Sequence, residues 1–421
     1  MTHELSAVRV AEKVYWVGAI DWEIRNFHGY LTSRGTTYNA FLVMADKVTL
    51  IDAVKAPFRQ ELLTRIASVV DPSRIDYIVS NHSEMDHSGC LPEVAAAVGP
   101  EKIFASGQGQ KALAEHFPDL AVQAVGDGEA VDLGGEKLSF FETKMCHWPD
   151  SMVSYLHGAK LLFSQDAFGM HLASAERFDD EIDGYLLEHE LGKYYANILM
   201  PLAVPIKRAL DKLTTSGLEF DIVAPDHGPI WRKGFARVLD LYRRWSGAER
   251  TNKALVVYDT MWQSTSKMAE AVQDGLSSGG TKTVVMPLES THRSDVAAEL
   301  LDAGAVVFGS PTINNQIFPS LADVLCYLRG LKPAGLLGAA FGSYGWSGEA
   351  TRLLTEAMDA MKIEQVAEPV RAKYVPSPDD LAACRELGAK VAQKLAEKHP
   401  SAVSKPGSRS FAWRRSSLHK G

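Results

Sequence analysis

Short apolar runs, each ended by a polar loop, recur along the first half of the chain. They include residues 77–80, 137–142, 160–164 and 220–224. Each run has the length of a buried strand, and the polar residues after it are typical of a loop. Strands at this density predict sheets that pack in layers. We therefore expect a sandwich of sheets with outer helices as far as about residue 250.

The pattern changes after residue 250, where apolar runs alternate with helical segments. The runs expected to form strands lie at residues 254–258, 305–309 and 336–341, and the helices at residues 264–276 and 320–329. Alternation at this spacing predicts a doubly wound parallel sheet, an α/β unit. A chain of 421 residues is also longer than one usual domain. We therefore expect two domains, at residues 1–250 and 251–400.

Composition narrows the class of protein. The formal net charge of −8 argues against a general nucleic-acid role, which needs a basic face. The tail at residues 401–421 is polar and basic, and we expect a disordered extension there. The first residues lack the basic and apolar regions of a signal peptide, and no apolar run has the length of a membrane span. We therefore expect a cytoplasmic protein.

The four cysteines lie far apart, at Cys90, Cys146, Cys326 and Cys384. No Cys-x-x-Cys pair is present, which excludes a fused rubredoxin module or a local iron–sulfur motif. The spacing does not suggest a secreted disulfide framework either. Cys146 precedes a histidine and is a possible metal ligand, but enough nitrogen and oxygen ligands exist without it. We favour a buried thiol at this position.

Four potential metal ligands, His82, Glu84, Asp86 and His87, fall within six residues. They directly follow the apolar run at residues 77–80, so we expect them on the loop that leaves a strand end. Imidazoles mixed with carboxylates suit iron, manganese or zinc. The alternative is a solvated polar loop. It is disfavoured because further ligand-type residues recur downstream in the same setting.

Those further residues are His147, Asp166 and His227, and each follows an apolar run by a short loop. Loops from several strand ends can assemble one site at one rim of a sheet scaffold. A structural zinc site needs about four ligands, so seven candidates suit two metals better than one. Asp166 stands alone between the two groups of ligands and is the natural bridge between two ions.

Three loops of the second half look like a flavin site. The loop before the helix at 264–276 carries Thr260, Ser264 and Thr265, whose hydroxyls and backbone N–H groups would bind a phosphate. The alternative is an ordinary helix cap. Two further loops, at 310–315 and 342–348, could enclose an isoalloxazine ring outside the strand ends. The residues expected to bind the cofactor are Thr260, Met261, Trp262, Gln263, Ser264, Thr265, Pro311, Thr312, Ile313, Asn314, Asn315, Ser343, Tyr344, Gly345, Trp346, Ser347 and Gly348.

The motif His-x-Glu-x-Asp-His at residues 82–87, followed by a later His, Asp and His, resembles the flavodiiron proteins. This family belongs to the metallo-β-lactamase superfamily, whose hydrolases usually carry a histidine where Glu84 stands. The second half of the chain resembles the FMN-binding flavodoxins, and flavodiiron proteins carry such a domain. The resemblance thus spans nearly the whole chain. It implies an N-terminal metallo-β-lactamase-like αββα sandwich and a C-terminal flavodoxin-like domain.

The resemblance also implies cofactors and ligand roles. FMN and two non-haem irons are expected, with one iron held by His82, Glu84 and His147. The other iron would be held by Asp86, His87 and His227, although a water could take the place of His87. Asp166 would bridge the two. The residues expected beside the metals, with a catalytic role, are His28 and Tyr195; His171 and Tyr194 are similar candidates, and His28 has the alternative of a purely structural histidine.

The activity implied is reduction of dioxygen to water, of nitric oxide to nitrous oxide, or of both. Electrons would reach the irons through FMN from an external donor, with a separate rubredoxin as the expected one, and the basic tail is a candidate docking segment for an acidic donor. The family also implies a head-to-tail homodimer. Two alternatives stay open from sequence: a zinc-dependent hydrolase of esters, thioesters or lactams fused to a flavodoxin domain, and an electron carrier with a degenerate metal domain.

Overall fold

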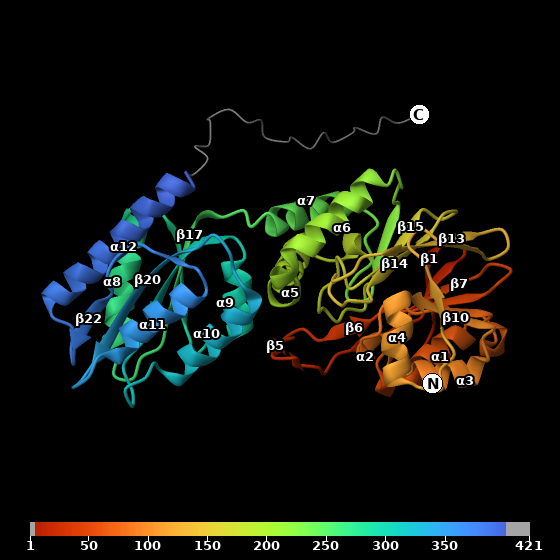
Figure 1. The fold of residues 1–421 in the computed structure, drawn as a ribbon, viewed down its shortest axis with the longest axis horizontal. Coiled ribbons are helices and arrows are strands. Elements are labelled where there is room, and N and C mark those ends of the chain that lie inside the picture. The colour runs from red at the N-terminus through yellow and green to blue at the C-terminus, as the bar shows by residue number, and fades with distance from the viewer. Residues whose placement is uncertain (1–4, 401–421) are drawn as a thin grey trace, which may run out of the picture.

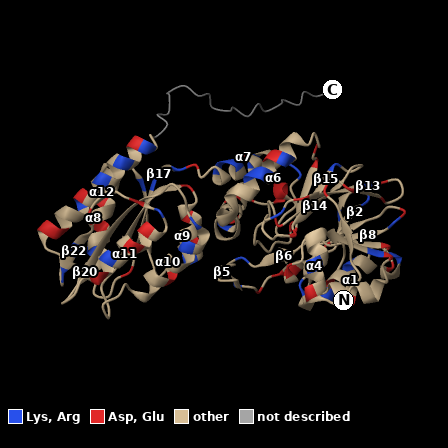
Figure 2. Ribbon diagram, viewed as in Figure 1, with Lys and Arg blue, Asp and Glu red and all other residues tan. Residues whose placement is uncertain are grey.

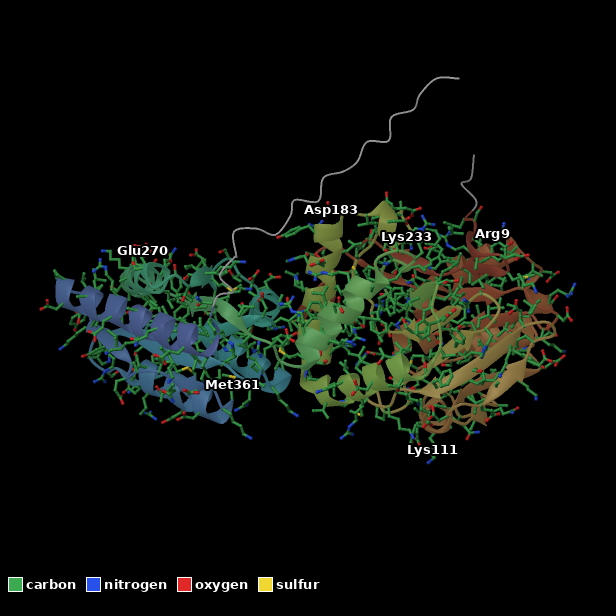
Figure 3. The ribbon with its side chains drawn as sticks, turned by 90° about the horizontal axis from the view of Figure 1, so that it is seen from above. Arg9, Lys111, Asp183, Lys233, Glu270 and Met361 are labelled. Atoms are coloured by element: carbon green, nitrogen blue, oxygen red, sulfur yellow. The ribbon has the colours of Figure 1, made fainter. Side chains whose placement is uncertain are left out.

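The computed structural model describes residues 5–400, and the chain forms two units that lie end to end (Figure 1). The basic tail expected at residues 401–421 lies outside the described residues. Seen from above, the labelled Arg9, Lys111 and Lys233 lie on one unit, and Glu270 and Met361 lie on the other (Figure 3). The helices that face each other between the units are α5 (Gly184–Tyr194) and α9 (Arg293–Leu300).

Two facing sheets form the centre of the N-terminal unit. The seven-stranded sheet has the order β1 (Val8–Ala11), β2 (Val14–Trp16), β7 (Phe41–Val43), β8 (Thr49–Ile51), β9 (Tyr77–Val79), β10 (Lys102–Ser106) and β11 (Gln123–Val125). The five-stranded sheet has the order β12 (Ala130–Asp132), β13 (Lys137–Glu142), β14 (Met152–Leu156), β15 (Leu161–Gln165) and β16 (Ile222–Pro225). Apolar side chains of both sheets meet between them, as where the rings of Phe41 and Phe163 lie 5.3 Å apart.

Helices cover the outer face of each sheet. The seven-stranded sheet is covered by α1 (Arg59–Ala67), α3 (Leu91–Val98) and α4 (Gly107–His116), and the five-stranded sheet by α5, α6 (Ala203–Thr215) and α7 (Phe235–Ser246). Strand β7 shows how alternation builds these layers: Phe41 and Val43 point between the sheets, whereas Leu42 packs under the outer helices. The expected αββα sandwich is confirmed.

One parallel sheet forms the centre of the C-terminal unit. Its order is β18 (Lys282–Pro287), β17 (Thr251–Tyr258), β19 (Ala303–Gly309), β20 (Leu337–Tyr344) and β21 (Glu364–Gln365), with β22 (Val370–Lys373) paired to β20. One face is covered by α8 (Ser264–Ser278) and α12 (Pro378–Lys398), and the other by α9, α10 (Pro319–Leu331) and α11 (Glu349–Ala360). The expected doubly wound, flavodoxin-like sheet is confirmed.

Two local features differ from the sequence expectation. Strand β20 continues to Tyr344, whereas the apolar run ended at Phe341, because β22 pairs with it as far as Tyr344 opposite Lys373. The ligand-bearing segment after β9 is also not loop throughout, since Met85–Ser88 forms the one-turn helix α2. In both places the expected site residues still lie at the strand ends.

The surface carries charges of both signs. Lys, Arg, Asp and Glu alternate along α8 and α12 in Figure 2. Such mixed faces are typical of solvated outer helices. Within residues 5–400, no helix is long and apolar enough to span a membrane.

Candidate metal centre

The first four ligand candidates are presented by a tight turn after β9. Glu84 precedes the first turn of α2, and Ser88 Oγ donates hydrogen bonds to the carbonyls of Ser83 (2.8 Å) and Glu84 (2.9 Å). The backbone N–H of Ser83 donates to Asp150 Oδ2 at 2.8 Å. These bonds hold His82 and Glu84 before the helix and place Asp86 on it, so that alternating side chains point toward the same region.

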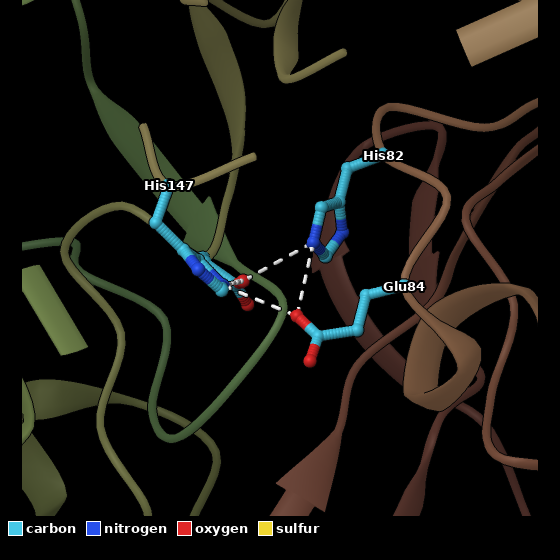
Figure 4. Close-up of side chains that lie close together, drawn as sticks. His82, Glu84 and His147 are labelled. Atoms are coloured by element: carbon cyan, nitrogen blue, oxygen red, sulfur yellow. Dashed lines mark hydrogen bonds and ion pairs between the residues drawn. The ribbon is translucent and has the colours of Figure 1, made fainter. Parts of the chain in front are cut away.

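Three of the expected ligands form a first group around one oxygen of Asp166. His147 Nε2 lies 2.8 Å from Asp166 Oδ2 and 3.2 Å from Glu84 Oε2. His82 Nε2 lies 3.4 Å from Glu84 Oε2 and 3.5 Å from Asp166 Oδ2. Figure 4 shows His82 and Glu84, from the turn after β9, and His147, from the loop between β13 and β14, pointing toward one another. The group has the composition and spacing of a metal site.

The other three expected ligands form a second group around the second oxygen of Asp166. His87 Nε2 lies 3.4 Å and His227 Nε2 3.5 Å from Asp166 Oδ1. Asp86 Oδ2 lies 3.2 Å from His227 Nε2 and 3.4 Å from His87 Nε2. His87 therefore points its Nε2 into this group. We refer to His82, Glu84, Asp86, His87, His147, Asp166 and His227 as the metal-ligand cluster.

The cluster has too few protein partners for its buried polar atoms. Both ring nitrogens of His82, both carboxylate oxygens of Asp86 and Asp166 Oδ1 are buried and have no hydrogen-bond partner among the described residues. Buried charged groups without partners cost several kcal/mol unless they are paired or coordinate metals. Two cations, one in each group, would satisfy these atoms. The residues present therefore fit a pair of metal ions with Asp166 between them.

The cluster also favours ionised carboxylates. Burial alone would raise the pKa of Glu84, but the nearby imidazoles of His147 and His82 hold that pKa at about 2. Burial alone would lower the pKa of His147, but the carboxylates of Asp166 and Glu84 raise it to about 10. Glu84 is therefore an anion at neutral pH. This negative charge distinguishes the cluster from one built mainly of neutral imidazoles.

A wall of aromatic residues lies beside the cluster. His28 Nε2 is 3.4 Å from Glu84 Oε1, although the His28 side chain is 76% exposed. Thr36 Oγ1 lies 2.9 Å from His171 Nδ1 and 3.3 Å from His227 Nδ1. Burial, together with the nearby His227, holds the pKa of His171 well below its usual range. His171 is therefore neutral near pH 7 and forms part of this wall, as expected for a residue beside the metals.

Tyr195, which the sequence analysis expects beside the metals, lies among other aromatic rings. Its ring packs against Tyr242 and Trp245, with ring centroids 5.1 Å apart in both pairs. Its neighbour Tyr194 instead lies beside the cluster, 6.1 Å from the His227 ring. Successive residues of a helix point about 100° apart, so only one of the two can face the site. The periodicity of apolar residues in α5 could have identified Tyr194 from the sequence, because Leu187, Leu191 and Tyr194 share the buried face of the helix.

Cys146 is buried and has a pKa raised to about 12 by that burial. It belongs to none of the ligand groups among the described residues. The expectation of a buried thiol is confirmed. Thr36 and Thr37, which the sequence analysis did not single out, are further residues of the site: the carbonyl of Thr37 lies 2.6 Å from His227 Nδ1 and orients that ring.

The expected flavin residues gather at the carboxyl ends of β17, β19 and β20. Thr265 Oγ1 and Ser343 Oγ lie 2.8 Å apart, and the N–H of Thr312 donates to the Ser343 carbonyl at 2.9 Å. The side chains of Trp262 and Trp346 are 89% and 88% exposed. We refer to residues 259–265, 310–316 and 343–348 as the strand-end loops. The three predicted loops are therefore brought together at one edge of the sheet.

The strand-end loops fit a flat, phosphorylated ring system. Thr260 Oγ1 is buried without a hydrogen-bond partner among the described residues, at the turn that precedes α8. A helix start with free donors favours a phosphate. Large exposed aromatic rings beside it are typical of a binding surface rather than of plain loop packing. Thr265 is tied to Ser343, so its hydroxyl serves to join two of the loops.

Comparison with known proteins agrees with both halves. The family model described as ODP family beta lactamase matches residues 36–228, and the flavodoxin model matches residues 256–388. A nitric oxide reductase of Moorella thermoacetica is 44% identical over 395 residues, which is 93% of this chain and 99% of that relative. The structure of rubredoxin oxygen:oxidoreductase from Desulfovibrio gigas superposes with a TM-score of 0.91 at 43% identity, over 93% of this chain and 99% of that one. The flavodiiron protein of Giardia intestinalis superposes with a TM-score of 0.90 at 33% identity, over 94% and 98%.

Proposed function

This chain belongs to the flavodiiron proteins, and on that premise we propose how its residues hold the cofactors and direct the reaction. It is an oxidoreductase with FMN and a non-haem di-iron centre. Its reaction is the reduction of dioxygen, of nitric oxide, or of both. FMN and the two irons, when bound, supply the electron transfer and bind the gas. The protein supplies the ligands, their orientation and a shielded pocket.

The assignment of ligands depends on one observation: the two oxygens of the Asp166 carboxylate face different ligand groups. Oδ2 faces the group of His82, Glu84 and His147, and Oδ1 faces the group of Asp86, His87 and His227. A carboxylate placed between two ligand groups is suited to bridge two ions. We propose that each group holds one iron. We further propose that His87 is a ligand, because its Nε2 points into the second group.

Glu84 argues for iron redox chemistry over zinc hydrolysis. An anionic ligand stabilises the ferric state more than a neutral imidazole would, because it offsets more of the added positive charge. A zinc hydrolase instead needs a metal-bound hydroxide and an open substrate cleft. The flavodoxin-like domain has no role in such a hydrolysis. The hydrolase alternative is therefore not favoured.

The residues beside the cluster have distinct tasks. The Thr37 carbonyl and the Thr36 hydroxyl hold the imidazole of His227 in one orientation. Tyr194 and the neutral His171 pack against His227 and exclude water from that side. His28 Nε2 faces Glu84 Oε1 and solvent at once. We propose that His28 moves protons from solvent toward the cluster.

A separate rubredoxin is the electron donor that we propose. The relative from Megalodesulfovibrio gigas is named a rubredoxin-oxygen oxidoreductase. The chain's own cysteines show no Cys-x-x-Cys pair that could form a fused rubredoxin module. The strand-end loops also expose Trp346, and an incoming donor would reach the flavin beside it.

A head-to-tail homodimer is the assembly that we propose. Met261, Trp262 and Tyr374 are exposed at the flavin edge, and Met85 is exposed between Glu84 and Asp86 of the metal-ligand cluster. Exposed large apolar side chains at two complementary places suit contact with a second copy. Such an arrangement would bring the flavin edge of one copy to the metals of the other.

We also propose the domain boundary at residue 250 and a cytoplasmic location. Helix α7 ends at Ser246, and β17 begins at Thr251. Residues 247–250 connect these two elements, and Arg250, at the end of this linker, donates hydrogen bonds to the carbonyls of Leu300 and Ala334 in the second unit. Three of the four cysteines are buried thiols without a disulfide, which suits a reducing compartment.

The proposed reaction is tested by gas consumption with a defined donor. Purified holoprotein is supplied with reduced rubredoxin, and the disappearance of dioxygen and of nitric oxide is followed in separate sealed cells, the latter without dioxygen. We expect the wild type to turn over at least one gas. Asp166→Asn should lose this activity, because the neutral amide cannot replace the carboxylate between two metal ions. Hydrolysis of an ester or lactam without gas turnover would contradict the proposal.

A further inference from the structure

The short hairpin that carries His28 is held by the flavodoxin-like unit of the same chain. Its strands, β4 (Asn26–Phe27) and β5 (Tyr30–Leu31), have two residues each. A hairpin of this length is not stable in water by itself. Its turn places His28 at φ 53° and Gly29 at φ 87°, in the left-handed region that is costly for a histidine. External contacts must therefore fix this turn.

Two consecutive residues at the start of α9 provide those contacts. Arg293 Nε donates to the carbonyl of Gly29 at 3.2 Å, and the N–H of Leu31 donates to Ser294 Oγ at 3.2 Å. These bonds join residues more than 260 positions apart in the sequence. In Figure 1, β5 reaches from the metal-binding unit toward α9 and α10 of the other unit. Both bonds hold the half of the hairpin that directly follows His28.

Arg293 is itself held firmly. Its Nη1 pairs with both carboxylate oxygens of Asp323, at 2.7 and 2.9 Å, and its guanidinium lies over the Tyr327 ring at 5.4 Å. Tyr327 in turn donates to Asn197 Oδ1 at 2.7 Å, and Asn197 lies on the metal-binding unit. A guanidinium fixed by a carboxylate and a ring keeps its remaining N–H groups in one direction.

The hairpin forms one wall of the metal-ligand cluster. The Phe27 ring lies 4.8 Å from the His171 ring and 6.2 Å from the His227 ring. The His28 ring lies 4.4 Å from Phe27 and faces Glu84 Oε1 at 3.4 Å. Because His28 is largely exposed, few contacts of its own side chain keep it there. Its position depends on the backbone turn that Arg293 and Ser294 hold.

We propose that Arg293 is a positioning residue: through the Gly29 carbonyl it holds His28 against the metal-ligand cluster of its own chain. The flavodoxin-like unit then has a second task besides binding FMN, because it completes the wall of the metal pocket. The proposal rests on the proposed function only for its activity readout. Its structural part is measurable without turnover.

Hydrogen exchange of the holoprotein tests the structural part. Arg293→Gln removes the charge and the Asp323 pair, and amide exchange of residues 26–31 should become roughly tenfold faster. Arg352→Gln is the matched control, because Arg352 pairs with Glu356 on the surface of α11 and does not contact the hairpin. Asp323→Asn is a second variant that loosens Arg293 without touching the hairpin. Unchanged exchange of residues 26–31 in both Arg293→Gln and Asp323→Asn would overturn the proposal.

A double-mutant cycle with His28→Ala tests the positioning part. Arg293→Gln should lower kcat for the gas roughly tenfold at unchanged KM, iron content and FMN content. In the His28→Ala background, Arg293→Gln should have no further effect, because its target is gone. Equal fold losses in both backgrounds, or full activity of His28→Ala, would overturn the positioning role. A wild type that turns over neither gas would instead refute the proposed function. The hydrogen-exchange result alone would then decide whether Arg293 holds the hairpin.

Discussion

Glu84 and His147 meet across the first ligand group, with Glu84 Oε2 3.2 Å from His147 Nε2. They come from segments more than 60 residues apart, the turn after β9 and the loop between β13 and β14. The contact brings an anion to a position where related hydrolases carry a histidine. The electronic character of the site therefore depends on this one carboxylate.

Replacing Glu84 by histidine should impair turnover. Glu84→His removes a carboxyl group whose pKa is held at about 2 and which is therefore negatively charged, so the ferric state loses stabilisation. We expect a loss of gas reduction of roughly tenfold or more, with zinc replacing part of the iron. Steady-state gas consumption and metal analysis check this. Glu93→His, on the exposed face of α3, is the control and should be neutral. Full oxidase or reductase activity of Glu84→His would contradict the electronic argument.

Tyr194 and Tyr195 should differ in their effects on the reaction. Tyr194 lies beside His227, and burial, with the nearby Asp166 next in importance, raises the pKa of its hydroxyl well above the usual value. Tyr194→Phe removes a protonated hydroxyl from the pocket and should lower kcat several-fold, which is less than the loss of a general acid would cause. Tyr195→Phe should leave kcat unchanged, because that ring lies against Tyr242. The reverse order of effects would show that the pocket is arranged differently.

Alkylation should distinguish the cysteines. Burial raises the pKa of Cys146 to about 12, of Cys384 to about 12 and of Cys90 to about 11. The thiolate is the reactive form, so these three should resist iodoacetamide at pH 8, whereas the exposed Cys326 reacts. Mass spectrometry of native and unfolded protein measures this, and unfolding should release all three. Rapid alkylation of Cys146 in the native protein would show that it is open to solvent.

Close packing of α8 against α12 should depend on Gly388. A Cβ at this position would lie 2.2 Å from the Val272 carbonyl oxygen, so the helices would have to separate. We expect Gly388→Ala to lower the free energy of unfolding by about 1–3 kcal/mol, as overpacking does. Gly330→Ala in α10 is the control, because its Cβ would meet nothing within 4 Å. Its helix propensity should raise stability by about 0.5–1 kcal/mol. The free energies of unfolding of the two variants are compared by urea unfolding, with FMN release as the signal.

The convergence of the metal-ligand cluster could be predicted from the sequence because its residues follow strand ends. Four of them lie in one six-residue motif, and parallel strand ends meet at one rim, so proximity followed from local pattern. Residues whose role depends on distant contacts were harder to predict. The end of β20 is set by pairing with β22, and the hold of Arg293 on Gly29 joins the two units. Tyr194 and Tyr195 are adjacent, and only the helical periodicity of α5 shows which of the two faces the cluster.

Metal and flavin content of the purified protein tests the central claim most directly. After expression with ample iron, elemental analysis and the flavin absorbance are measured together on the same sample. About two irons and one FMN per chain are expected, since two ligand groups share Asp166 and one set of strand-end loops is present. Zinc in place of iron under these conditions would contradict the redox assignment, and iron without FMN would contradict the assignment of the strand-end loops.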